Sequence, residues 1–353
     1  MFKPTRHLIG AAVLATVTIV LVVLARCLPD FWYSFYTDFS RGAMQVLGVV
    51  FGWIPFPAWE ILLVLLVIAI LCGLVYAVRT SRGRGFLCAL LELAVLLITL
   101  FVGLWGLNGF APTIGEQTGL EVKDYTVEQL QEAAAWYADE ASFYSVAVKR
   151  DEDGNVVLPE FSELSDAGVA AYERLAQEND RFKLPVRQVK PLLVSEAFAH
   201  MGSDGVFMCL TGEAGVSSET FGLTQPFTIC HELGHSLAVA REDEANYLGF
   251  LACRASDTPL FRYSGYYNAF VYCYEALYDK SPVAARKVRE HCSDELLRDI
   301  DLHVEYDQQY EGEVRTIAQA VNNAYIKTFD EAGVRSYGLV VDYLVADYLK
   351  MAD

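Results

Sequence analysis

Three apolar runs in the first 108 residues constrain the fold more than any other feature of the sequence. The first has no charged side chain from Leu8 to Ala25, and the other two each contain a single acid, Glu60 or Glu92. A helix rises about 1.5 Å per residue, so each run is long enough to cross a hydrocarbon core of about 30 Å. We therefore predict a bundle of three transmembrane helices at about residues 8–28, 59–78 and 86–108.

The basic residues of this region predict its orientation. Lys3 and Arg6 precede the first run, and three arginines lie in the short segment 79–85 between the second and third runs. Loops rich in Lys and Arg stay in the cytoplasm. We therefore predict a multi-pass cell-membrane protein with a cytoplasmic N-terminus and with everything after residue 108 on the extracytoplasmic side.

Two features of the membrane region leave alternatives open. The loop 29–58 contains the aromatic segments DFWYSFY and FGWIPFP, which suit a membrane-interface belt, and part of it can form a short re-entrant or interfacial helix. Glu92 lies well inside the third run. An intramembrane acid is either functional or a protonated or helix-paired acid near an interface. We favour the second interpretation for Glu92.

Residues 109–353 form the predicted extracytoplasmic domain, and 245 residues suffice for one sizeable core. Seven of the 27 basic and four of the 45 acidic side chains lie before residue 109, which leaves 20 basic and 41 acidic side chains and a net charge of −21. Such an acidic surface disfavours nucleic acid and anionic lipid. We expect no nucleic-acid partner.

The patterns in this domain predict an α+β fold that is mostly helical. Thr126, followed three residues later by a glutamine, forms a capping-box pattern, and Thr224, followed by a proline in the first turn, marks another helix start. The apolar, β-branched stretches 186–195 and 205–217 are predicted strands. The predicted helices cover residues 126–147, 165–180, 224–240, 242–253, 264–280, 281–306 and 336–352.

The sequence HELGH places His231 and His235 four residues apart on a predicted helix. Residues with that spacing share a helix face, so both imidazoles can bind one metal ion. Glu232 lies beside that face, where its carboxylate can act as a general base on a water molecule at the metal. The pattern therefore predicts a catalytic metal site.

A catalytic zinc ion needs a third protein ligand and one open position, and the EDEAN segment that follows offers acidic candidates. We expect the first helix to break near residues 238–241 and a second helix to begin with these acids. Glu242 and Asn246 share a face of that helix, whereas Glu244 lies on another. The pattern can thus present one carboxylate to the metal and the Asn246 amide to a liganding histidine.

HELGH with EDEAN resembles the HExxH and ExxAD/N signatures of zincin metallopeptidases that use a glutamate ligand. The segments are similar to those of the HtpX and CAAX-endopeptidase group and of the ImmA/IrrE-type peptidases. The resemblance implies a zincin-like domain with one Zn²⁺ per chain, in which the HELGH histidines and Glu242 are ligands. Only six residues separate His235 from Glu242, far fewer than in those families, so Glu244 stays an alternative ligand.

The chain as a whole resembles a family of bacterial three-span membrane proteins described only as a domain of unknown function. The shared segments are TGEA, CHELGH, EDEAN, FRYSGY and a late GVRSYG. This resemblance covers nearly all of the chain and supports the predicted fold and topology, but it implies no substrate.

The mechanism implied is metal-assisted hydrolysis of a peptide bond. Zinc lowers the pKa of a bound water toward ~7 and polarises the substrate carbonyl, and Glu232 moves the proton of that water to the leaving amine. The carbonyl oxyanion needs a further hydrogen-bond donor. The candidate donors are Tyr263 and Tyr337, with the neighbouring Arg262, Tyr266 and Arg335.

The predicted strand 205–217 can bind an extended peptide by adding it as a further strand. Glu213 then either faces a basic substrate group or is simply an acid in a turn. Together these features predict a membrane-anchored zinc metalloendopeptidase that acts on a peptide or protein. The alternative is a non-catalytic zinc-binding membrane sensor or scaffold, and the presence of Glu232 argues against it because metal binding alone does not require that acid.

Overall fold

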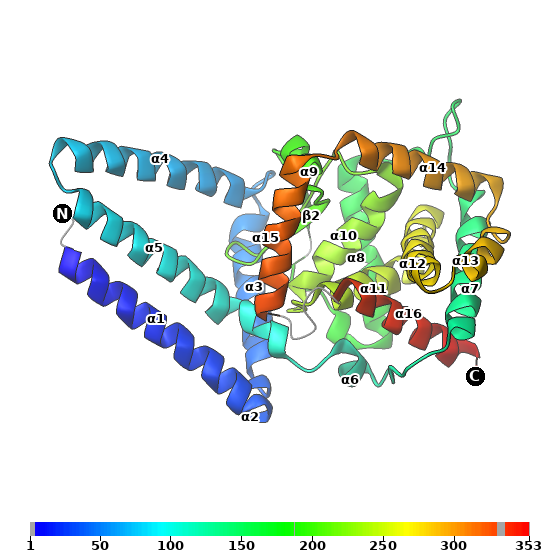
Figure 1. Ribbon diagram of the computed structural model, residues 1–353, viewed down its shortest axis with the longest axis horizontal. Coiled ribbons are helices and arrows are strands. Elements are labelled where there is room, and N and C mark those ends of the chain that lie inside the picture. The colour runs from blue at the N-terminus through cyan, green and yellow to red at the C-terminus, as the bar shows by residue number, and fades with distance from the viewer. Residues whose placement is uncertain (1–3, 187, 330–335, 353) are drawn as a thin grey trace.

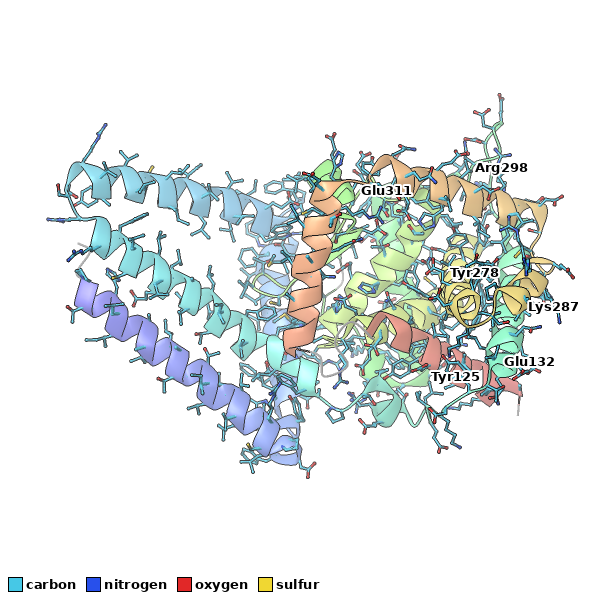
Figure 2. All side chains as sticks on the ribbon, in the orientation of Figure 1. Tyr125, Glu132, Tyr278, Lys287, Arg298 and Glu311 are labelled. Atoms are coloured by element: carbon cyan, nitrogen blue, oxygen red, sulfur yellow. The ribbon has the colours of Figure 1, made fainter. Side chains whose placement is uncertain are left out.

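Three helices of the computed structural model are long and apolar enough to cross a membrane. The structure describes residues 4–186, 188–329 and 336–352, without the side chains of 323, 325–329 and 336–339. The three helices are α1 (Pro4–Cys27), α4 (Ala58–Arg79) and α5 (Gly83–Leu104). Figure 2 shows these helices extending away from the rest of the protein, with side chains on all their sides. The predicted apolar helices are thus confirmed and indicate association with a lipid bilayer, whereas their orientation stays a prediction.

Helices α1 and α5 pack against each other along their length (Figure 1). The hydroxyls of Thr18 and Thr99 lie 2.9 Å apart across this contact. Glu92 accepts a hydrogen bond from the Nδ1 atom of His7, with the two atoms 2.5 Å apart. Glu92 is therefore a helix-paired acid, in agreement with the interpretation that we favoured.

The aromatic loop between the first two long helices is itself largely helical. It forms α2 (Pro29–Tyr33) and α3 (Tyr36–Gly52). Figure 1 shows α3 running across the ends of the long helices, between them and the rest of the chain. The third long helix ends at Leu104 rather than at residue 108, because the backbone leaves the helical region at Trp105 and a 3-10 turn, η1 (Gly106–Phe110), follows.

The chain beyond η1 is mostly helical. Thr126 caps α7 as predicted, because its hydroxyl accepts the N–H of Gln129 in a capping box. In order, the helices are α6 (Ile114–Thr118), α7 (Val127–Ser145), α8 (Phe161–Glu178), α9 (Ser195–Met201), α10 (Gln225–Ser236), α11 (Glu242–Ala255), α12 (Pro259–Lys280), α13 (Pro282–Arg289), α14 (Asp294–Gln309), α15 (Glu313–Phe329) and α16 (Ser336–Ala352), with 3-10 turns η2 (Asp180–Phe182) and η3 (Gly222–Thr224).

Several of these helices differ from the predicted extents. Helix α8 begins before Ser165, whose hydroxyl accepts the backbone N–H of Val189 instead of capping a helix. The predicted helix 281–306 is two helices, because Ser293 caps a new one by accepting the N–H of Leu296. Helices α6, α9 and α15 were not predicted, and α15 packs against α9 (Figure 1).

A small sheet of three strands supports α10. The strands β1 (Val189–Pro191), β2 (Gly205–Met208) and β3 (Glu213–Val216) have the order β1-β3-β2. The predicted single strand 205–217 is therefore an antiparallel hairpin, and its turn uses Gly212 at φ 65°. The predicted strand 186–195 shortens to three residues, since Pro191 lacks an N–H and α9 begins soon after it.

One large hydrophobic core joins α7, α8, α10, α11, α12 and α16. Buried aromatic side chains such as Tyr137, Tyr172 and Phe250 fill it. The core also contains Met44 from α3 and Trp105 from the end of α5. The division into residues 1–108 and 109–353 stays a prediction. Met44 and Trp105 belong to the first part and pack against side chains of the second. The protein is mostly helical, and a zincin-like architecture also stays a prediction.

Candidate metal centre

Helix α10 carries the HELGH sequence and is buried on almost every side. Thr224 precedes it as predicted, but its hydroxyl donates to the carbonyl of Phe221 and does not cap the helix. The N–H of Phe227 in the first turn instead reaches the hydroxyl of Ser264 on α12, at 3.1 Å. A side chain from a distant helix thus satisfies a donor that the first turn leaves without a partner.

A tight turn connects α10 to α11, as the short spacing requires. Ala238 has φ 67°, a left-handed conformation that costs roughly 1–2 kcal/mol for a residue with a Cβ. The N–H groups of Leu237 and Ala238 bond to the carbonyls of Gly234 and His235 at 3.0 Å each. The turn reverses the chain and brings the first residue of α11, Glu242, back to the end of α10.

Small residues let α10 and α11 approach closely. A Cβ atom at Gly249 would lie 3.3 Å from the backbone nitrogen of His231, and one at Gly234 would lie 3.5 Å from the Cβ of Leu248. Ala245 lies opposite Gly234, because its carbonyl oxygen is 3.8 Å from the same Cβ position. The liganding face of α10 is therefore set directly against the first turns of α11.

The two histidines and Glu242 bring three potential ligand atoms together. The Nε2 atoms of His231 and His235 are 3.0 Å apart, and they lie 3.3 Å and 3.8 Å from the same carboxylate oxygen of Glu242. Tetrahedral zinc with bonds of about 2.0–2.1 Å places its ligand atoms about 3.3 Å from one another. These residues therefore fit a zinc ion with three protein ligands.

Hydrogen bonding supports this role for His235. Its Nδ1 atom lies 2.8 Å from the carbonyl of Val239 in the connecting turn. A carbonyl accepts only, so Nδ1 carries the proton and Nε2 offers its lone pair to the cluster. The Nδ1 atom of His231 is buried and has no hydrogen-bond partner among the described residues. Asn246 lies close enough to His231 to contribute to its raised pKa, after the larger contributions of Glu242 and Glu232, and its role as a supporting amide stays a prediction.

The pKa values of the cluster residues depend on both their burial and the charges of their neighbours. Burial lowers the pKa of His235 to about 4, so this imidazole is neutral near pH 7. Burial would also lower the pKa of His231, but the Glu242 carboxylate and the neighbouring Glu232 raise it above its ordinary value. Burial would raise the pKa of Glu242, yet the two histidines hold it at about 2. Glu242 is therefore an anion facing two nitrogen atoms, which is the charge pattern a divalent cation needs.

Glu232 lies beside this cluster and against the edge of the sheet. A Cβ at Gly205 on β2 would come within 2.5 Å of its Oε1 atom, so the strand needs glycine there. Its Oε2 atom is buried without a hydrogen-bond partner among the described residues. Burial raises the pKa of Glu232 to about 8. A carboxyl group with this pKa can exchange a proton near neutral pH.

Glu244, the alternative ligand, is occupied elsewhere. One of its carboxylate oxygens lies 2.8 Å from Arg241, 3.1 Å from the N–H of Ile114 and 3.3 Å from the hydroxyl of Tyr343. Two of these partners, Ile114 and Tyr343, belong to α6 and α16, which lie on the side of α11 away from the histidines. The geometry therefore brings Glu242, and not Glu244, to the histidines.

Glu213 does not face a cleft. Its carboxylate lies 2.6 Å from the ammonium group of Lys190 on β1, and only 2–3% of either side chain is exposed. The same carboxylate accepts the N–H groups of Ala58 and Trp59 at the start of α4. The expectation that Glu213 meets a basic substrate group is therefore not met, because an internal lysine already occupies it.

Among the tyrosines and arginines predicted as oxyanion donors, the three whose side chains are described have partners away from the cluster. Tyr263 is buried and donates to Asp299 at 2.5 Å. Arg262 bonds to the carbonyl of Ser256 and to Tyr144, whose ring stacks on Tyr266. Arg335 lies outside the described residues, and Tyr337 belongs to α16 but its side chain is among those not described.

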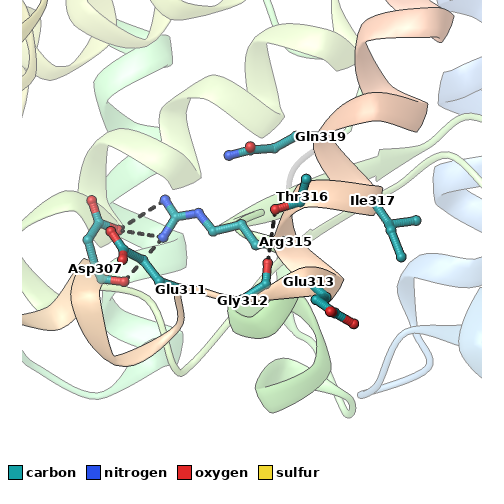
Figure 3. Close-up of a pocket in the computed structure, with 8 residues that line it drawn as sticks. All are labelled: Asp307, Glu311, Gly312, Glu313, Arg315, Thr316, Ile317 and Gln319. Atoms are coloured by element: carbon teal, nitrogen blue, oxygen red, sulfur yellow. Dashed lines mark hydrogen bonds and ion pairs between the residues drawn. The ribbon is translucent and has the colours of Figure 1, made fainter.

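Two recesses of the surface lie away from the metal cluster. The larger, of about 770 Å³, opens where α14 meets α15, and Figure 3 shows Arg315 reaching across it to Asp307. The second, of about 730 Å³, is lined by Glu244 and Tyr343 on the far side of α11. None of the three cluster residues lines either one.

Sequence reasoning missed Trp105, the first residue after α5. Its indole N–H points to the carbonyl of His235 at 3.4 Å, and the two rings meet edge to face with centroids 5.8 Å apart. The centroid of the same ring lies 6.3 Å from the ring centroid of Phe207 on β2. An aromatic residue after an apolar run indicates only an interface anchor, so no pattern in the sequence linked it to the site.

The fold and the cluster define a helical protein with three apolar N-terminal helices and a His/His/Glu group that could hold a metal ion. The chain belongs to the family described as "Protein of unknown function (DUF3810)", whose profile matches residues 35–345. No curated protein and no solved structure matches the chain. The expected membership of a family of unknown function is confirmed, and the resemblance to zinc metallopeptidases stays a prediction.

Proposed function

We propose that the protein is a membrane-anchored zinc metallopeptidase with a zincin-like site. The observation that carries this proposal is the triangle of ligand atoms from His231, His235 and Glu242, with sides of 3.0, 3.3 and 3.8 Å. Three protein ligands leave one position for water or substrate, the arrangement of catalytic rather than structural zinc sites. The Glu242 side chain is 24% exposed, which makes it the most exposed of the three proposed ligands.

Glu232 is the proposed general base and acid. A zinc ion in the triangle supplies Lewis acidity, which lowers the pKa of a water molecule and polarises a peptide carbonyl. The unpartnered Oε2 atom of Glu232 is available to take a proton from the attacking water. The same carboxyl group then gives that proton to the departing amine. Its raised pKa, about 8, makes the carboxylate a stronger base than an ordinary glutamate and so favours uptake of the proton from the water.

The edge strand β2 offers a place for an extended substrate. In the order β1-β3-β2 it pairs only with β3 among the described strands, so its other edge has N–H and C=O groups to offer. Gly205 brings this strand to the side chain of Glu232. A peptide added to that edge lies next to the proposed base, with its backbone held by strand hydrogen bonds.

Metal content and turnover test this proposal in the full-length protein, purified in detergent. We expect about one zinc per chain in the wild type and its loss in His235→Ala. The matched control is His291→Ala, because His291 is a surface histidine paired only with Asp139 among the contacts described for it. A folded wild-type protein that takes up no zinc would contradict the proposal.

The variant Glu232→Gln separates the enzyme from a non-catalytic zinc sensor. The peptidase proposal predicts that this variant keeps its zinc and loses peptide hydrolysis, because the amide cannot accept the proton. A sensor would keep both its zinc and its function in the cell, since Glu232 is not one of the three ligands.

A further inference from the structure

Helix α3 has one face against the domain and one apolar face exposed. Gly48 lies against Gly212 in the turn of the β2–β3 hairpin, and Met44 is fully buried in the core. At 100° per residue, the exposed side chains fall within an arc of roughly 100° on the other face. They are Phe39, Val46, Val49, Val50 and Trp53, with exposed fractions of 52–82%.

Side chains of α3 also hold the last turn of α5. The hydroxyl of Tyr36 donates to the carbonyl of Val102 at 3.2 Å, and that of Ser40 donates to the carbonyl of Leu104 at 2.7 Å. These carbonyls belong to the final turn of a helix and have no partner within it. Helix α3 is thereby fixed across the point where an apolar, membrane-length helix ends, as Figure 1 shows.

The lipid headgroup layer is the occupant that suits the exposed face of α3. The face continues the apolar surface of the long helices and lies opposite the domain. Its most exposed member is a tryptophan, the residue type that prefers membrane interfaces. An exposed row of this kind is unusual on a surface that meets only water.

A single side chain then separates the end of α5 from the metal centre. Trp105 follows Leu104 directly and contacts His235 through its indole N–H and the edge of its ring. It also contacts Phe207 on β2, the strand beside Glu232. The depth of α5 in the bilayer therefore determines how far the candidate ligands lie from the lipid.

We propose that the metal centre works at the bilayer surface and selects polypeptides that are themselves anchored in the membrane. This inference rests on the proposed peptidase function and names its substrate class. An extended chain covers about 3.3–3.6 Å per residue, so the segment presented to the site is the first few residues after a span. Anchoring both partners in one bilayer raises their effective concentration without any new contact.

The depth of α3 is tested by tryptophan quenching in the full-length protein. The protein is reconstituted in phosphatidylcholine vesicles with and without bromine atoms on the acyl chains. The emission of Trp53 is obtained by subtracting the spectrum of Trp53→Phe from that of the wild type. Because Trp53 lies in the lipid, we expect bromine to quench most of this emission. The emission of Trp136, obtained in the same way from Trp136→Phe, is expected to be equal in the two kinds of vesicle. Trp136 packs against Tyr137 and Tyr266 in the domain. Equal emission from Trp53 in both vesicles would overturn the placement.

The substrate class is tested with one pool of randomised peptide segments presented in three ways. The pool directly follows a single apolar span, or is joined to that span by a flexible spacer of about 40 residues with a mean reach of about 35 Å, or has no span. Each is incubated with the reconstituted, zinc-loaded protein and with Glu232→Gln. We expect the directly anchored pool to be cleaved at least about tenfold faster than the unanchored pool, with the spaced pool between them.

The outcomes of this assay separate the inference from the proposed function. Equal cleavage of all three pools by the wild type, absent in Glu232→Gln, would leave the peptidase and overturn the selection of anchored substrates. Cleavage of none of the pools by a zinc-loaded wild type would overturn the peptidase and the inference with it. The quenching experiment then still decides whether the metal centre lies at the bilayer surface.

Discussion

The Nε2 atom of His231 lies 3.3 Å from a carboxylate oxygen of Glu242, although the two residues belong to different helices. The contact exists because the turn at Ala238 is tight and because Gly249 lets α11 lie against the backbone of His231. It distinguishes Glu242 from Glu244 two residues later, whose carboxylate is held by Arg241. The two acids give a matched pair of variants.

Glu242→Gln and Glu244→Gln should differ in zinc affinity. We expect Glu242→Gln to weaken zinc binding by more than tenfold, because it removes a charged ligand. Glu244→Gln should leave the affinity nearly unchanged, because the contacts of its carboxylate are with Arg241, Ile114 and Tyr343 and not with a proposed ligand. It should also destabilise the fold by roughly 1–3 kcal/mol, since Arg241 loses a buried partner. Competition with a chelator measures the affinity, and the reverse order would make Glu244 the ligand.

Zinc affinity should fall as the pH falls below the pKa of His231. That pKa is raised, so in the absence of metal the imidazole gains a proton at a higher pH than an ordinary histidine and must release it to bind zinc. His235, with a pKa of about 4, and Glu242, with a pKa of about 2, stay in their binding forms over this range. Zinc is therefore expected to bind more weakly as the pH falls below the pKa of His231.

Calorimetry in buffers of different ionisation enthalpy counts the protons released in this reaction. Glu232 is mostly protonated at pH 7, because its pKa is about 8, and a cation nearby favours its ionised form. The wild type should thus release more protons than Glu232→Gln on binding zinc. Equal release by the two proteins would contradict the placement of Glu232 beside the metal.

Gly205→Ala should abolish turnover while zinc stays bound. The new Cβ would lie 2.5 Å from Oε1 and 2.8 Å from Cγ of Glu232, so the carboxylate must move. The three proposed ligands are not touched by this change. The matched control is Gly312→Ala, since nothing lies within 4 Å of a Cβ at that position. A fully active Gly205→Ala enzyme would argue against Glu232 as the base.

Local spacing explains which parts of the site could be predicted from the sequence. HELGH sets two histidines on one face of a helix, and EDEAN starts a second helix, so both patterns depend only on neighbouring residues. The contact between Trp105 and His235 joins residues 130 positions apart. It depends on how the end of α5 packs against α10, and hydropathy carries no information about that packing.

The same limit explains why the pairing of Glu213 with Lys190 was not predicted. Its partner Lys190 is brought beside it by the parallel pairing of β1 with β3, in which Lys190 is opposite Gly215. A lysine within a short apolar strand suggests an exposed side chain, because lysine is rarely buried unless it is paired. Strand register decides such a pairing, and the sequence alone does not specify the register of three-residue strands.

Gly249→Val should separate α10 from α11 and weaken zinc binding. A Cβ at this position already lies 3.3 Å from the backbone nitrogen of His231, and the two further methyl groups of valine have no room. Overpacking of this kind costs typically about 1–3 kcal/mol. Thermal unfolding in one detergent measures the loss, with Gly312→Val as a control at an open position. An unchanged midpoint and unchanged zinc affinity would show that the helices do not depend on this contact.

Lys190→Met should destabilise the protein more than the double variant Lys190→Met with Glu213→Gln. The single change leaves a carboxylate buried without its cation, which costs roughly 3–5 kcal/mol. In the double variant a neutral amide oxygen still accepts the N–H groups of Ala58 and Trp59, so the start of α4 keeps its cap. Thermal unfolding midpoints in the same detergent compare the two. If the double variant unfolds at a lower temperature than the single one, the main contribution of Glu213 is its charge at the start of α4 and not its pairing with Lys190.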